Sequence, residues 1–387
     1  MSVLTYRTAG ESHGPALTVL VEGLPAGLRV DLDLINAELR RRQGGYGRGG
    51  RMRIEKDAAD LLSGVRREKT IGSPLVMQIR NRDSRLDEAP EIARPRPGHA
   101  DLAGSLKWLT TDCRETLERA SARETAARVA AGALAKNLLR KFDVACVGFV
   151  VQIGTAEATV PEDADADELV ALRDANDAYT PDADAAERMT AAIRAAKRDG
   201  DTIGGIVEVR VFGLPPGLGS CASWQSKLDG RLMQAVGSIQ AFKGVEIGLG
   251  FEAARRPGSA VHDAIHFDPD RRNSREFGFV RKTNRAGGLE GGMTNGNTLV
   301  IRGAMKPIAT LMQGMDSVNL QTLKPERSDY ERSDVCAVPA ASVVAENVVA
   351  FEIARAWVDK FGGDTMQEVR AAYEHYAAAV RKLASPG

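Results

Sequence analysis

The sequence contains little cysteine, few aromatic residues and no excess of charge. Its four cysteines lie far apart without a C-x-x-C pair, which favours free thiols in a reducing compartment over a disulfide framework or a zinc site. Lys and Arg number 52, as do Asp and Glu, so the overall charge gives no reason to expect binding to nucleic acid or an anionic membrane. The longest apolar stretch, residues 144–153, is about half the roughly 20 residues of a transmembrane helix, and no signal peptide opens the chain. These absences predict a cytoplasmic protein with neither a membrane nor a nucleic-acid partner.

The 387 residues combine strand and helix patterns in an irregular order. Because 43% of them are apolar and no linker interrupts the middle of the chain, we expect one domain over residues 1–387. An Asp33 cap predicts a helix with Ile35 and Leu39 on one face, and an alanine-rich stretch predicts another helix over 123–142. Irregular alternation argues against a doubly wound parallel sheet. Short β-branched runs between turn residues predict strands at 17–22, 75–79, 144–153, 206–212 and 298–301.

Residues 157–187 form an acidic, alanine-rich excursion with eleven acids and one base. Segments of this composition bury little apolar area, so we expect a solvated helical excursion without a chemical role. The excursion therefore extends the domain without contributing to its predicted site.

Residues 40–53 carry six arginines and no acid, and glycines separate several of them. Glycine lets backbone approach a ligand closely, and guanidinium groups bind phosphate and carboxylate oxygens in a bidentate way. The segment therefore predicts an anion site. The alternative is a flexible RGG-like segment that contacts nucleic acid. Against this alternative, the cluster occurs once, directly after a predicted helix, and Tyr46 is its only aromatic residue.

A second anion site is predicted at residues 119–125. Ser121 and Glu124 have the spacing of a capping box, so we expect a helix to begin at Ala122. The free N–H groups at its start, flanked by Arg119 and Arg123, suit an anion. The alternative, equally supported, is a well-capped surface helix.

Two of the five histidines lie in loops rich in glycine or proline: His13 in residues 10–14 and His99 in residues 94–101. A histidine in a rigid loop near arginines is suited to proton transfer, although either one alone could be structural or exposed. Residues 10–14 also match the G-x-S-x-G pattern of serine hydrolases. They do not follow a predicted strand and lack a credible triad, which argues against that class.

The C-terminal half contains further short segments with glycine turns or isolated charges. None of them is a Walker A loop or a G-x-G-x-x-G fingerprint, so the sequence supports neither a P-loop nor a Rossmann nucleotide site. These segments are residues 199–205, 238–248, 291–296, 306–310 and 332–336.

In their order along the chain, these motifs closely resemble the chorismate synthase family. The resemblance runs nearly end to end and implies an α+β fold, a β-α-β sandwich subunit and a homotetramer. It implies a lyase of the shikimate pathway that eliminates phosphate from 5-enolpyruvylshikimate 3-phosphate in a 1,4 sense to give chorismate, for aromatic amino acid biosynthesis. Reduced FMN is the implied cofactor, although the reaction has no net redox change. The matching segments are residues 10–14, 40–51, 94–101, 119–125, 291–296 and 332–339.

The resemblance also implies three catalytic residues. His13 matches a histidine near the leaving phosphate, and His99 matches one that protonates the anionic reduced flavin. Asp334 matches the aspartate that assists proton removal at the flavin N5. Residues 327–329 repeat the Arg-Ser-Asp of 332–334, and we choose Asp334 over Asp329 because Val-Cys-Ala-Val-Pro follows it, as in the family.

Cofactor and substrate contacts follow from the same resemblance. Arg42 and Arg48 match arginines for NADP that lie near substrate, and no metal is implied. The reducing equivalents come either from NADPH or from a separate flavin reductase, and these alternatives stay open. The substrate carries about four negative charges and the FMN phosphate about two, which suits two arginine-rich sites. The implied FMN contacts are Arg119, Ala120, Ser121, Gln240, Ala241, Gly291, Lys306, Pro307, Ile308, Ala309, Thr310 and Arg332.

Overall fold

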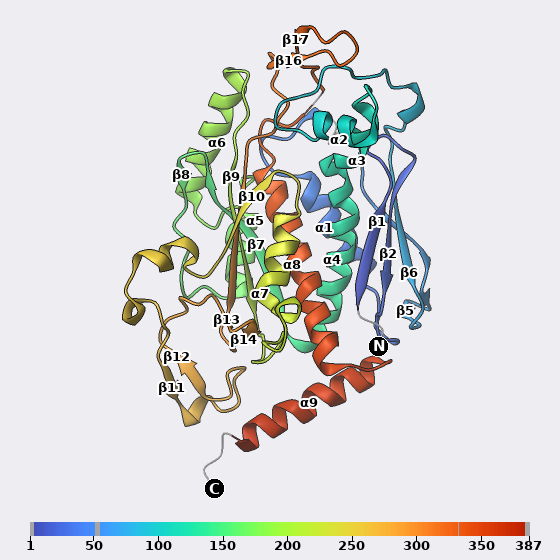
Figure 1. Cartoon of the computed structure of the whole chain (residues 1–387). Coiled ribbons are helices and arrows are strands. Elements are labelled where there is room, and N and C mark those ends of the chain that lie inside the picture. Colours follow the sequence, from blue (N-terminus) through green and yellow to red (C-terminus); the bar gives the residue numbers. More distant parts are fainter. Residues whose placement is uncertain (1–3, 51–54, 332, 384–387) are drawn as a thin grey trace.

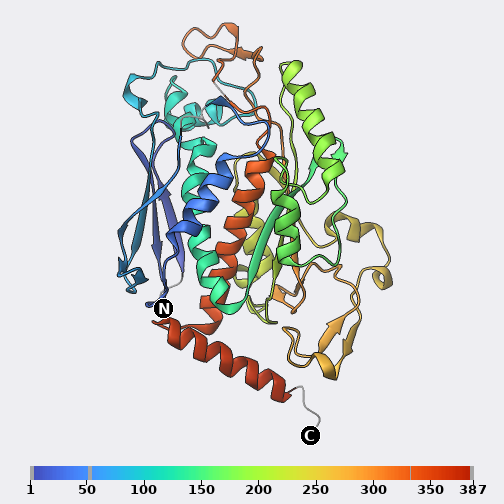
Figure 2. The ribbon, with the colours of Figure 1, turned by 180° about the vertical axis from the view of Figure 1, so that it is seen from behind.

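Two antiparallel sheets enclose a layer of helices in the computed structural model, which describes residues 4–50, 55–331 and 333–383. One sheet lies on each side of the helices in both views (Figures 1 and 2). The strand order is β1-β2-β6-β3 in the first sheet and β10-β15-β9-β7-β8 in the second. This arrangement confirms the predicted α+β class and the β-α-β sandwich.

The elements have the following bounds. The first sheet contains β1 Thr5–Ala9, β2 Ala16–Glu22, β3 Ala59–Ser63 and β6 Leu75–Arg80. The second contains β7 Ala145–Ile153, β8 Ala156–Glu157, β9 Gly205–Phe212, β10 Phe242–Ile247 and β15 Leu299–Met305. The α-helices are α1 Leu32–Gln43, α2 Asp101–Trp108, α3 Arg114–Ala120, α4 Thr125–Leu139, α5 Ala166–Asp174, α6 Ala183–Arg198, α7 Leu228–Gly237, α8 Val338–Phe361 and α9 Met366–Leu383. Short pairs are β4 Val65–Arg66 with β5 Lys69–Thr70, β11 Ile265–Phe267 with β12 Phe279–Arg281, β13 Leu289–Glu290 with β14 Met293–Thr294, and β16 Asp316–Val318 with β17 Pro325–Arg327.

The predicted strands correspond to β2, β6, β7, β9 and β15 of the structure. Four of the five match within one residue at each end, because β-branched runs end at turn residues. The last, β15, continues to Met305, four residues beyond the predicted end. The alanine-rich helix is α4, with a 3-10 turn at each end.

Helices α4 and α8 form the centre of the sandwich (Figure 1). Nearly every residue of both is buried, as expected for a helix that is apolar on all sides. Their backbones come close at Gly132, where a Cβ atom would lie 2.2 Å from the carbonyl oxygen of Asn347. Alanine and glycine on α4 therefore set the distance between the two central helices. Across the described residues, no helix combines the length and apolarity needed to cross a membrane.

Of the two predicted helix caps, the one at Asp33 is wrong and the one at Ser121 is confirmed without its capping box. Asp31, rather than Asp33, caps α1, and its carboxylate accepts from the N–H of Leu34 at 2.9 Å. Ser121 does cap the 3-10 turn that begins at Ala122. The carboxylate of Glu124 does not complete a capping box, because it accepts instead from Thr8, Gln240 and Arg128. Glu124 therefore connects β1, α4 and the segment that carries Gln240.

The acidic excursion is helical, as predicted, but the expectation of little apolar burial is wrong. Its helices, α5 and α6, pack on the second sheet, and Leu169 and Ala185 are fully buried. Arg173, the one base within 157–187, is also buried and donates to Glu346 at 3.2 Å. The alanines and one leucine supply an apolar face that the abundance of acids conceals.

A buried ionic network fixes α1 against α4 and α8. Lys136 on α4 donates to Glu38 at 3.0 Å and to Glu346, and Arg41 contacts the same two carboxylates at 2.6 and 2.8 Å. Burial alone would raise the pKa of Glu38 and Glu346, but Lys136 and Arg41 hold both pKa values below their usual range. The network positions the end of α1, where Arg42 follows Arg41.

Candidate active site

The loop that carries His13, between β1 and β2, is held against the end of α3. The N–H of Ser12 donates to the carbonyl of Glu118 at 3.0 Å, and Arg119 donates to a carbonyl of the same loop at 2.9 Å. The hydroxyl oxygens of Ser121 and Ser12 lie 3.2 Å apart. The structure thus brings together His13, Arg119 and Ser121, which come from segments more than 100 residues apart.

His13 is oriented by the carboxylate of Glu118. Its Nδ1 lies 2.9 and 3.0 Å from the two carboxylate oxygens, and its backbone N–H donates to Oε2 at 2.8 Å. Burial alone would raise the pKa of Glu118, but the hydrogen bonds from His13 lower it below its usual value. On the other side of the ring, Nε2 lies 3.7 Å from Asp83.

His99 has a comparable setting at the start of α2. Its Nδ1 is hydrogen-bonded to Asp101 and lies 3.0 Å from an Arg96 nitrogen. Burial alone would raise the pKa of Asp101, but hydrogen bonds with His99 and Arg96 hold it well below its usual range. Arg96 also donates to Thr310 Oγ1 at 2.9 Å. This bond links the His99 loop to the predicted FMN segment 306–310.

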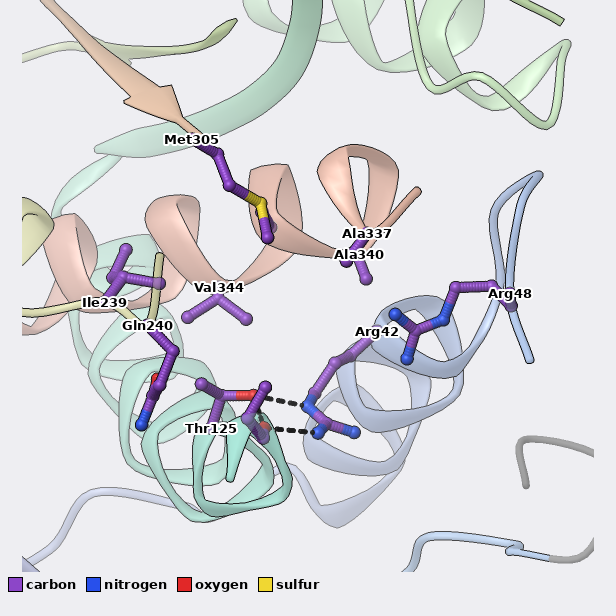
Figure 3. A pocket seen from close by; sticks show the side chains of 11 residues that line it. Arg42, Arg48, Thr125, Ile239, Gln240, Met305, Ala337, Ala340 and Val344 are labelled. Atoms are coloured by element: carbon purple, nitrogen blue, oxygen red, sulfur yellow. Dashed lines mark hydrogen bonds between the residues drawn. The ribbon is translucent and has the colours of Figure 1, made fainter. Parts of the chain in front are cut away.

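Arg42 lies at the C-terminal end of α1, almost fully buried. It donates to Thr125 Oγ1 at 2.9 Å and to the carbonyl of Ala122 at 3.0 Å (Figure 3). Burial lowers the pKa of Arg42 to about 9; Asp57 opposes this effect, while the cations of Arg123 and Arg48 add to it. A bound anion would offset the free-energy cost of burying the charged guanidinium, so this position suits an anionic ligand.

Arg123 does not serve the helix terminus as predicted. Its guanidinium is buried and donates to both oxygens of Asp57 at 2.7 Å and to Asn81 at 2.9 Å. Asp57 thereby holds Arg123 and Arg42 together, 3.4 Å from the latter. Arg123 supports Arg42 rather than facing a ligand.

Arg48 and Asp334 form an ion pair at 2.5 Å, and the N–H of Gly49 donates to the same carboxylate at 2.6 Å. The close approach requires glycine, because a Cβ on Gly49 would lie 2.8 Å from the carbonyl oxygen of Ser333. Residues 44–50 therefore pack against residues 333–339 instead of forming a free RGG-like segment. Tyr46, the one aromatic of the segment, stacks against Arg194.

The predicted FMN segments around Gln240 and Lys306 meet at a strained turn. Ala241 has φ +68°, a left-handed conformation that is uncommon for alanine, and its carbonyl accepts from the N–H of Lys306 at 3.0 Å. Glu124 accepts from the side-chain amide of Gln240 at 3.2 Å. The Lys306 ammonium faces the His99 loop beside Gly98, and burial lowers its pKa. These segments line one side of the same region.

A pocket of about 340 Å³, a volume that includes open solvent at its mouth, is lined by Arg42, Arg48 and Gln240 among these groups. Figure 3 shows Arg42 and Arg48 on one side and Gln240, Met305 and Val344 across from them. One wall is cationic and the other largely apolar, which suits a ligand with anionic groups and a flat apolar portion. Its remaining lining residues are Ala122, Thr125, Ile239, Ala337, Ala340 and Ala341.

Among the described residues, Arg42, Arg48 and Gln240 are the predicted site residues that line this pocket. Gly291 follows β13, and the carbonyl of its neighbour Gly292 accepts from Leu228 at the start of α7. Gln240 follows the other end of that ten-residue helix, which is about 15 Å long. Arg332 lies outside the described residues. Asp329 pairs with Arg94, not with Arg48.

Sequence reasoning did not find the carboxylates that hold the functional side chains. Glu118 and Asp57 are separated from their partners by 105 and 66 residues, so no local pattern connects them. Asp101 is only two residues from His99 and lies within the motif already selected. Its His-x-Asp spacing is the one signal that was available.

Comparison with known proteins shows the family. The chorismate synthase family model matches residues 4–358. The chain belongs to the chorismate synthase family. It is 54% identical to a chorismate synthase of Geobacter sulfurreducens, over 98% of this chain and 100% of that protein. A chorismate synthase of Symbiobacterium thermophilum is likewise 54% identical over 98% of this chain.

A solved structure supports the same assignment. A crystal structure of chorismate synthase superposes with a TM-score of 0.80 at 42% identity, covering 98% of each chain. Membership of the chorismate synthase family makes this protein an enzyme, a lyase of the shikimate pathway. The β-α-β sandwich is therefore the fold of an enzyme, and its relatives match it over nearly the whole chain.

Proposed function

We propose that this enzyme converts 5-enolpyruvylshikimate 3-phosphate to chorismate by 1,4-elimination of phosphate, with reduced FMN as cofactor. The observation that carries the proposal is the pocket of Figure 3, which has arginines on one wall and apolar side chains on the other. Near this pocket, Ser121 contacts the His13 loop and is the neighbour of the lining residue Ala122, while Arg96 links the His99 loop to Thr310. Such a pocket can hold a polyanionic substrate against a flat ring.

The residues around the pocket fit a flavin. The carbonyl oxygen of the Gln240 side chain is buried without a hydrogen-bond partner among the described residues, and a flavin ring offers an N–H donor. By the family resemblance, Ser121, Lys306 and Thr310 would hold the rest of the cofactor, while Met305 of the pocket lining would supply an apolar contact. When bound, reduced FMN supplies an electron that the reaction uses and returns.

The protein's own groups supply protons and charge. His13 holds a proton on the nitrogen opposite Glu118, for the leaving phosphate, and His99 holds one on the nitrogen opposite Asp101. Asp334 is the proposed base, and its ion pair with Arg48 orients it. Arg42 and Arg48 offset substrate charge in a partly closed site. The proposal also includes cytoplasmic location and a homotetramer.

Anaerobic turnover tests the proposed function. With chemically reduced FMN and 5-enolpyruvylshikimate 3-phosphate, we expect the absorbance of chorismate to rise together with equimolar phosphate, and no product with oxidised FMN alone. Adding NADPH to the oxidised mixture then distinguishes reduction by this enzyme from a requirement for a separate flavin reductase. Absence of chorismate with fully reduced FMN would contradict the proposal.

Arg48→Lys should raise the KM for substrate by about tenfold or more, equivalent to about 1.4 kcal/mol. A lysine ammonium cannot reproduce the planar guanidinium that pairs with Asp334 while facing the pocket. The measurement is steady-state KM under anaerobic conditions. Arg40→Lys is the matched control, because Arg40 lies exposed near the end of α1, a few residues before Arg48, and does not line the pocket. An unchanged KM in Arg48→Lys removes Arg48 from substrate binding.

A further inference from the structure

His13 lies between two carboxylates that come from different parts of the chain. Glu118, on α3, contacts Nδ1 with both oxygens at 2.9 and 3.0 Å, and its side chain is 1% exposed. Asp83, after β6, lies 3.7 Å from Nε2 and is 22% exposed. The buried carboxylate is therefore bonded to one ring nitrogen, while the accessible one stands beyond hydrogen-bond distance of the other.

The contact with Glu118 determines which nitrogen carries a proton when the ring is neutral. An ionised carboxylate only accepts hydrogen bonds, so Nδ1 must donate to it. Glu118 also accepts from the backbone N–H of His13 at 2.8 Å, so ring and backbone are fixed by one group. A neutral His13 then has its proton on Nδ1 and an unprotonated Nε2.

The surroundings of Glu118 keep it ionised and in place. Arg114, one helical turn earlier on α3, lies 3.4 Å from Oε1 and is itself buried. Its other nitrogens donate to the carbonyl of Pro90 at 3.0 Å and to Glu331 at 3.1 Å. Other charged groups around the His13 loop are Asp83 with its partner Arg85, Glu55, which accepts from the N–H groups of residues 82 and 83, Glu11 on the same loop, and Arg119, which donates to the carbonyl of Gly10.

We propose that Glu118 is the positioning residue of His13: it holds a proton on Nδ1 and so makes Nε2 the nitrogen that delivers a proton to the leaving group. This inference rests on the proposed function for the identity of that group. As the carbon–oxygen bond to phosphate breaks, its electron pair stays on the phosphate oxygen, and the Nε2 proton moves to the phosphate. The ring is left neutral with its Nδ1 proton still bound to Glu118. The ring does not need to rotate during this transfer, because its Nδ1 stays hydrogen-bonded to Glu118.

Nitrogen NMR of ¹⁵N-histidine-labelled enzyme tests the assignment without substrate or flavin. The chain has five histidines, so His13→Gln identifies the His13 signals. Above the midpoint of its titration, wild-type His13 should show a protonated Nδ1 and an unprotonated Nε2. A neutral ring protonated on Nε2 overturns the proposal, even if no variant of Glu118 folds.

Glu118→Gln supplies the second arm. The amide is nearly isosteric but lacks the charge that stabilises the imidazolium, so the midpoint for His13 should fall by about one pH unit or more. The alkaline limb of the profile of kcat against pH should shift to lower pH by the same amount, while KM changes little. Glu118→Asp should restore part of the shift. Glu115→Gln, exposed on the same helix, is the control.

The two arms separate failure of the inference from failure of the proposed function. If Glu118→Gln leaves both the His13 midpoint and the alkaline limb of kcat unchanged, Glu118 has no positioning role. If wild-type enzyme forms no chorismate, the proposed function fails, while the NMR result still decides whether Glu118 holds the Nδ1 proton.

Discussion

Replacing His13 or His99 with alanine should lower kcat for chorismate formation by about 10² to 10⁴-fold, the range typical of removing a general acid or base. Each imidazole is bonded through Nδ1 to a buried carboxylate, and each is only partly exposed, at 13% and 23%. Such a ring is oriented on one side and has a nitrogen left for proton exchange on the other. The fold should persist, because neither ring belongs to the apolar core.

The measurement is kcat under anaerobic conditions with chemically reduced FMN, accompanied by thermal unfolding of each variant. His375→Ala is the control, because His375 lies exposed on α9. We expect the control to keep wild-type turnover. A His13 or His99 variant that also keeps wild-type turnover is not part of the mechanism.

The sequence predicts strands better than it predicts helix starts in this fold. The run at β7 is apolar apart from Gly148 and Gln152 and ends at a turn, so its limits could be placed within a residue. At α1, Asp31 and Asp33 both precede the apolar positions, and capping chemistry alone does not choose between them. The choice depends on where the chain enters the helix layer: the N–H of Asp31 donates to Asn137 of α4, 106 residues away.

The same limit applies to the candidate site. Local motifs led to His13, His99 and Arg48, which lie in loops of unusual composition. Their partners did not stand out, because one glutamate such as Glu118 is indistinguishable among 52 acidic residues until folding places it beside a histidine. The glycines of 44–50 were interpreted as freedom to approach a ligand, whereas Gly49 makes room for the backbone of Ser333.

Asp334→Asn and Asp329→Asn should differ sharply, although both aspartates lie in the same Arg-Ser-Asp context. Asp334 pairs with the pocket residue Arg48, whereas Asp329 pairs with Arg94, whose side chain is 43% exposed. If Asp334 is the base, Asp334→Asn should slow the chemical step by about 10² to 10⁴-fold. The asparagine oxygen can still accept from the N–H of Gly49, so the loop should keep its place. Asp329→Asn should change the rate less than about twofold, because Asp329 pairs with Arg94 and neither residue lines the pocket.

Single-turnover chorismate formation with pre-reduced flavin, measured side by side for the two variants, isolates this step. FMN binding in the presence of substrate serves as the control for an intact pocket, and we expect it to stay near the wild-type value in both. Because Asp334→Asn also removes the partner of Arg48, the Arg48→Lys variant is run in parallel. A base at Asp334 predicts a slow step even at saturating substrate, whereas an effect through Arg48 alone disappears at saturation. The assignment is wrong if Asp329→Asn is the slow variant, and no aspartate relay operates here if both variants react at the wild-type rate.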